Sequence, residues 1–64
     1  MDIVEARKNA RYTQQQVADI LGISRPTYAR MEKNPGDITV DDANKIAKIF
    51  GIKVADIFFA NDCN

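Results

Sequence analysis

The side chains best suited to recognising a ligand lie between Arg25 and Arg30. An arginine guanidinium can donate two hydrogen bonds to O6 and N7 of guanine, so Arg25 and Arg30 could read guanines in a DNA major groove. Thr27 could offer its hydroxyl to a base or its methyl group to thymine. Pro26 has no donor on its side chain or backbone, so it could read only by shape, for example against a thymine methyl. The alternative role for both arginines is to clamp phosphates without base specificity.

These residues follow a turn between two short predicted helices. Thr13 can cap the first helix, and Gln16 three residues later completes a capping box. Gly22 can end that helix in the left-handed conformation, and Ser24 can cap the second helix. Tyr28 is expected in the core with its hydroxyl at the rim. Helical spacing directs the other apolar residues inward: Val17, Ala18, Leu21, Ile23 and Met31. The outer face is left with Arg25, Thr27, Ala29 and Arg30.

The stretch QQQVADILGISRPTYARME resembles the Cro/repressor-type helix-turn-helix family of phage and bacterial regulators, or XRE family. Nearly every position of the family pattern is met from Thr13 to Glu32, and the likeness continues through IAKIFGI and VADIFF. The resemblance implies an all-α, five-helix, lambda-repressor-like domain over residues 1–64. Its helix-turn-helix would span about residues 14–33, with the helix of residues 25–33 in the major groove.

The resemblance also implies contacts between the protein and the DNA backbone. Arg7 would pair with Glu32 and hold its guanidinium beside a phosphate; the alternative is a purely structural pair. Gln14 would donate its amide to a phosphate at the groove edge, helped by the positive end of its helix. The full set of residues expected to contact phosphates is Arg7, Thr13, Gln14, Gln15, Lys33 and Asn34. Family members often carry glutamine or another polar residue at the position of Pro26, so this chain departs from the pattern there.

The remaining helices are predicted from signals at their ends. A first helix is expected at residues 2–10, and a fourth follows the cap residue Thr39 and ends at Gly51. A short fifth helix, from Val54 to about Phe59, follows Lys53 in place of the usual Ser or Asp cap, so its start should fray. Burial is expected for Ile3, Val4, Ala6, Ala10, Ile38, Val40, Ala43, Ile46, Ala47 and Phe50.

Length and composition place the chain among small globular domains. Its 64 residues are near the lower size for unaided folding, and 45% of them are hydrophobic. No apolar run approaches the roughly 20 residues that span a bilayer, and Asp2 and Glu5 interrupt any secretory signal. The single Cys63 excludes an internal disulfide and is expected to be a reduced thiol, with cross-linking of two chains as the alternative. We therefore expect a cytoplasmic protein that does not associate with membranes.

Charge is unevenly distributed along a chain whose formal net charge is zero. Residues 1–34 carry two more basic than acidic side chains, and residues 35–64 carry two more acidic than basic. This division favours a basic face and an acidic back, although ordinary scatter of charges would give similar numbers.

The inventory of reactive side chains argues against an enzyme. The sequence has no histidine, one cysteine near its end, no glycine-rich phosphate loop and no paired motif of metal ligands. The adjacent carboxylates Asp41 and Asp42 are better explained by the favourable position of acidic residues at a helix N-terminus than by a catalytic role. We therefore expect neither catalysis nor a cofactor nor a bound metal.

Two functions are consistent with these features. The first is a sequence-specific transcriptional regulator, most like a phage Cro protein or small repressor, that binds double-stranded DNA at an inverted repeat. The second is a protein-interaction module, such as an antitoxin, with DNA binding secondary. A homodimer on DNA, weak or monomeric when free, could form through the C-terminal apolar residues Ile57, Phe58 and Phe59. The alternative is that all three lie in the core.

Overall fold

The computed structural model describes residues 2–58, and its first four α-helices begin at side-chain caps. Asp2, Thr13, Ser24 and Thr39 each accept a hydrogen bond from the backbone N–H three residues later, which satisfies a donor that has no partner within the helix. At Thr13 the capping box with Gln16 is complete. The elements are α1 (Ile3–Asn9), α2 (Gln14–Leu21), α3 (Arg25–Lys33), the 3-10 helix η1 (Pro35–Asp37), α4 (Val40–Phe50) and α5 (Val54–Phe58).

Residues in the left-handed conformation end three of these helices. Gly22 closes α2 with φ 73° and Gly51 closes α4 with φ 71°, as predicted. Arg11, just beyond α1, also has a positive φ of 64°, and its N–H donates to the carbonyl of Lys8. This conformation costs a residue with a Cβ about 1–2 kcal/mol, and nothing in the sequence indicated it.

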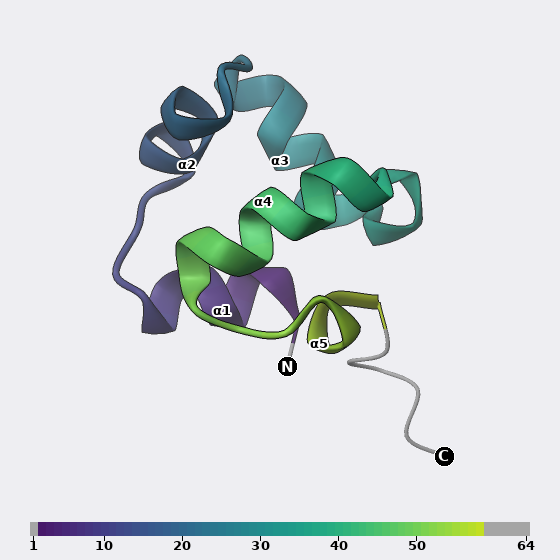
Figure 1. Ribbon diagram of the computed structural model, residues 1–64. Coiled ribbons are helices and arrows are strands. Elements are labelled where there is room, and N and C mark those ends of the chain that lie inside the picture. The colour runs from purple at the N-terminus through teal and green to yellow at the C-terminus, as the bar shows by residue number, and fades with distance from the viewer. Residues whose placement is uncertain (1, 59–64) are drawn as a thin grey trace.

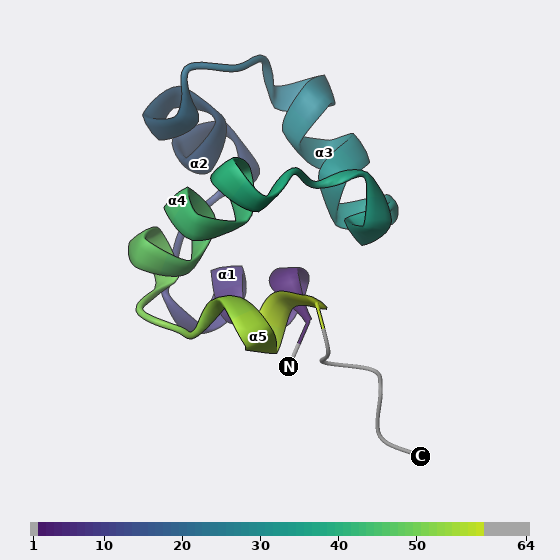
Figure 2. The same cartoon turned by 45° about the vertical axis from the view of Figure 1, so that its right-hand side comes forward.

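Helix α4 crosses the middle of the fold (Figure 1). In both views α2 and α3 lie on one side of it, and α1 and α5 lie on the other (Figure 2). The side chains that fill the space between the helices are Ile3, Ala6, Val17, Ala18, Tyr28, Ile38, Ala43, Ile46, Ala47, Phe50 and Ile57. The predicted all-helical, five-helix fold is confirmed. None of the helices in the described part of the chain is both long and apolar enough to cross a membrane.

One predicted burial assignment is wrong. Val40 is 67% exposed, because it begins α4 and the apolar stripe of this helix reaches the core only from Ala43 onward. Val4 and Ala10, which were also expected to be buried, are partly buried. Conversely, Ile20 on α2 is 56% exposed although it is apolar.

At the start of α5, the side chain of Asp56 is a hydrogen-bond acceptor that was not predicted from the sequence. The backbone N–H of Lys53 donates to Oδ2 of Asp56, at 3.4 Å. This is the reverse half of a capping box, in which the third residue of the helix accepts from the residue before it. The side chain of Asp56 therefore holds the residue that precedes α5, but it does not do what a Ser or Asp cap would do, which is to accept from an N–H of the first turn.

Candidate nucleic-acid interface

Helix α3 is held in place by its inner face. Tyr28 is fully buried in the core, and Met31 is partly buried against it. The short turn after Gly22 sets α3 against α2, and the Ser24 cap fixes its first residue. The opposite side of α3 faces solvent, because residues at the intervening helical positions point away from the core.

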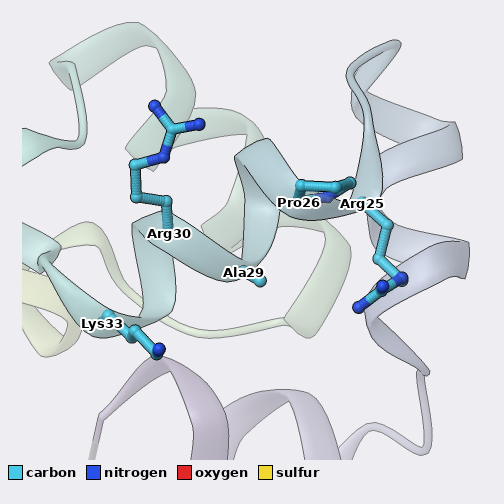
Figure 3. Close-up of a pocket in the computed structure, with 5 residues that line it drawn as sticks. All are labelled: Arg25, Pro26, Ala29, Arg30 and Lys33. Carbon is cyan, nitrogen blue, oxygen red and sulfur yellow. The ribbon is translucent and has the colours of Figure 1, made fainter.

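Five residues of this outer face line an open groove of about 400 Å³, namely Arg25, Pro26, Ala29, Arg30 and Lys33 (Figure 3). The side chains of the three basic residues are exposed, and none of the three forms an ion pair with another residue between positions 2 and 58. A groove with three cations and no acidic lining residue attracts a polyanion. This arrangement is what contact with a DNA backbone and its base edges requires.

Thr27 does not line this groove with the other predicted base-reading residues. Its Oγ1 is 2.8 Å from Oγ of Ser24, so the two hydroxyls share a hydrogen bond. Thr27 lines a second hollow of about 190 Å³ with Arg30, Met31 and Asp37. The structure thus brings Arg25, Pro26 and Arg30 together in one groove and leaves Thr27 at its margin.

A partly buried polar network joins α1, α2 and α3. Arg7 Nε donates to Glu32 Oε2 at 2.6 Å, and Arg7 Nη1 donates to the carbonyl of Tyr12 at 3.0 Å. Gln14 Nε2 donates to Glu32 Oε1 at 2.8 Å. The side chains of Arg7 and Glu32 are only 12% and 5% exposed. The ion pair implied by the family resemblance is therefore present, and it is extended by a glutamine from α2.

The surroundings of Glu32 shift three pKa values. Burial alone would raise the pKa of Glu32, but hydrogen bonds from Arg7 and Gln14 outweigh it and leave this pKa below its ordinary value. The hydrogen bond to Glu32 raises the pKa of Arg7. Burial, and then the neighbouring Glu32, raises the pKa of Tyr28 far above its ordinary value.

The hydroxyl of Tyr28 corrects another prediction. It was expected at the rim of the core, but its oxygen is buried and has no hydrogen-bond partner among the described residues. The whole ring inserts between the helices because Tyr28 occupies the centre of the inner face of α3. The polar end of this side chain thus lies inside, near the charged pair.

Hydrogen bonds within the protein engage most of the residues expected to contact phosphates. Gln14 donates one N–H to Glu32, which leaves the second N–H of its amide for another acceptor. Gln15 Nε2 donates to Asp19 Oδ1 at 2.8 Å. The hydroxyl of Thr13 caps α2, while Asn34 ends α3 with its side chain exposed. Roles for these residues on DNA stay predictions.

One hydrogen bond and one residue of the site were not predicted from the sequence. The Gln14–Glu32 hydrogen bond joins residues 18 positions apart, and no local pattern indicates it. Ala29 was placed on the outer face but not among the reading residues. Its spacing of three from Pro26, which puts both on one side of the helix, was the available signal.

Of the three residues predicted to form a dimer contact, the structure places the side chain of one, Ile57. Ile57 is 4% exposed and belongs to the core, so it offers no surface to a partner. The side chain of Phe58 and the whole of Phe59 lie outside the described residues. Among the residues that the structure describes, no group of three or more possible metal ligands comes together.

Comparison with known proteins agrees with this geometry. The helix-turn-helix family model matches residues 3–57. An uncharacterized HTH-type transcriptional regulator of Methanocaldococcus jannaschii is 46% identical over 50 residues, covering 78% of this chain and 76% of that protein. The uncharacterized HTH-type transcriptional regulator YgzD of Bacillus subtilis is 31% identical over 62 residues, covering 97% and 94%.

A longer relative shares the same region. A putative HTH-type transcriptional regulatory protein of Pyrococcus furiosus is 36% identical over 59 residues, which are 88% of this chain but 19% of that protein. No solved structure gives a significant match. With its five helices, its α2–α3 turn and a family match over most of its length, the chain belongs to the Cro/repressor-type (XRE) helix-turn-helix family of DNA-binding proteins.

Proposed function

We propose that the protein is a sequence-specific transcriptional regulator that lays α3 in the major groove of double-stranded DNA and acts as a repressor. The observation that carries this proposal is the groove on the outer face of α3, with Arg25, Arg30 and Lys33 around it. A recognition helix enters the groove with its N-terminal residues at the base edges. The names of the relatives, which are HTH-type transcriptional regulators, support the same assignment.

Arg25 and Arg30 are the proposed readers of guanine, because both are exposed on the groove side of α3. Pro26 contributes shape, and Thr27 acts from the margin of the groove. Lys33 and Asn34 lie at the C-terminal end of α3, where they would contact phosphates and add affinity on any sequence.

The Arg7–Glu32–Gln14 network has a proposed role at the groove edge. Arg7 is tied to Glu32 and to the backbone of Tyr12, so its guanidinium is held in one orientation. Gln14 lies in the first turn of α2, whose positive end favours an anion. A DNA phosphate beside this network would receive the second N–H of Gln14. Thr13 and Gln15 would contact the same strand of backbone.

On DNA the protein is proposed to act as a two-fold dimer on an inverted repeat. One copy of α3 covers only a few base pairs, and a single half-site gives too low a ratio of specific to non-specific binding. Two half-sites about 34 Å apart would solve this problem. Because Ile57 is buried, we propose that Phe58 and Phe59 make the contact between the two copies. A contact this small should give only a weak dimer in the absence of DNA.

Selection of bound duplexes from random DNA, followed by footprinting, tests the proposal. We expect an enriched inverted repeat, protected in both halves, with binding that is cooperative in protein concentration. Enrichment of no sequence would refute sequence-specific binding. A one-to-one complex on a single asymmetric site would refute the dimer while leaving the role of α3 intact. In the cell, a reporter placed behind the selected site should lose expression when this cytoplasmic regulator is present.

A further inference from the structure

The floor of the groove on α3 is apolar. Pro26 and Ala29 are three residues apart and lie together on the groove side, between the outward-pointing side chains of Arg25, Arg30 and Lys33 (Figure 3). Pro26 lacks a backbone N–H, and neither side chain has a donor or an acceptor. This Pro26–Ala29 strip therefore cannot hydrogen-bond to a base.

Both side chains of the strip are also short. Alanine ends at Cβ and proline folds back on its own backbone, so the helix backbone can approach the base edges closely at this point. The basic residues on either side attract the phosphates of both strands and keep the strip over the floor of the DNA groove. The base-edge group that faces the strip then determines whether this close contact is favourable.

The major groove presents hydrogen-bonding atoms and one apolar group, the C5-methyl of thymine. A donor or acceptor covered by the strip would lose its water and gain no partner, which costs free energy. A methyl group makes no hydrogen bond to water that it could lose, and its burial against the strip is favourable. Building on the proposed DNA-binding function, we infer that the Pro26–Ala29 strip binds the C5-methyl group of a pyrimidine. Because 5-methylcytosine carries its methyl group at the same ring position, the protein distinguishes methylated from unmethylated cytosine there.

The test uses the whole protein and the duplex obtained by selection from random DNA. Each thymine is replaced in turn by uracil, which removes only the C5-methyl group. At one or two positions per half-site we expect affinity to fall about fourfold, because burying one methyl group is worth about 0.8 kcal/mol. When cytosine replaces thymine at such a position, 5-methylcytosine should bind about fourfold more tightly than cytosine.

Two variants assign the methyl contact to the strip. In Ala29→Gly and Pro26→Gln, the thymine-to-uracil ratio at the sensitive position should fall towards one. This ratio is measured within a single protein preparation, so it does not depend on the fraction that is folded. Ala55→Gly, the same change at an exposed position of α5, is the matched control and should keep the fourfold ratio.

The outcomes separate this inference from the proposed function. A selected duplex that is bound specifically but tolerates uracil at every thymine overturns the methyl contact and leaves DNA recognition intact. A fourfold ratio that persists in both Ala29→Gly and Pro26→Gln shows that other residues contact the methyl group, which also overturns the inference. Failure to enrich any sequence overturns sequence-specific binding and the methyl contact together.

Discussion

Arg7 on α1 and Glu32 on α3 form an ion pair in which Nε and Oε2 are 2.6 Å apart. The two residues are separated by 25 positions in the sequence, and their side chains are largely buried. Because Gln14 from α2 donates to the same carboxylate, one side chain connects all three helices. This contact fixes the orientation of α3 relative to the rest of the domain.

Removing the carboxylate should destabilise the fold. We expect Glu32→Ala to lower the free energy of unfolding by about 1–3 kcal/mol, because it leaves the partly buried guanidinium of Arg7 without a counter-charge. Urea denaturation followed by circular dichroism measures the change. Lys45→Ala is the matched control, since its pair with Asp41 is exposed and longer, at 3.6 Å, and should contribute less than about 0.5 kcal/mol. Equal stability of Glu32→Ala and the parent would contradict a structural role for the pair.

The same carboxylate makes stability depend on pH. The pKa of Glu32 is lower in the folded chain than its ordinary value of 4.5, so the folded state binds its proton less readily than the unfolded state. The stabilisation is complete above about pH 4.5 and is lost as the pH falls through the folded pKa. Glu32→Gln has no such proton to gain, so its unfolding free energy should fall less steeply between about pH 5 and 3. Parallel curves for the parent and the variant would show that Glu32 does not contribute.

The left-handed Arg11 offers a way to stabilise the protein. Glycine adopts a positive φ without a Cβ clash, so Arg11→Gly should raise the free energy of unfolding by about 1 kcal/mol. Thermal denaturation should then show a midpoint several degrees higher, about 4–8 °C for a domain of this size. Arg11→Ala keeps the Cβ and is the control for loss of the charged side chain. If Ala stabilises as much as Gly, the effect comes from charge and not from the backbone.

Local signals predicted much of the fold. Thr13 with Gln16, Ser24, Thr39, Gly22 and Gly51 mark helix ends through contacts within a few residues, and the structure confirms each of them. Burial depends on tertiary packing, and the prediction failed at Val40 because the apolar stripe of α4 reaches the core only from Ala43 onward.

The candidate site was predictable to a smaller extent. Arg25, Pro26 and Arg30 share the groove because helical spacing places them on one face. The hydrogen bond between Ser24 and Thr27 is a local contact at the start of α3, whereas the donation from Gln14 to Glu32 arises from the packing of α2 against α3. No residue pattern along the chain encodes the contact between Gln14 and Glu32, so only the structure reveals that Gln14 is already engaged.

The most direct test of the central claim, that α3 reads DNA sequence, compares Arg25→Ala with Lys33→Ala. Affinities of both variants and the parent are measured by fluorescence anisotropy, on the selected duplex and on a scrambled one, over a range of salt concentrations. Arg25→Ala should lose about 1–3 kcal/mol on the selected duplex and much less on the scrambled one. Lys33→Ala should weaken both duplexes alike and reduce the salt slope by about 1. Equal losses on the two duplexes for Arg25→Ala and for the corresponding Arg30→Ala would contradict base reading by α3.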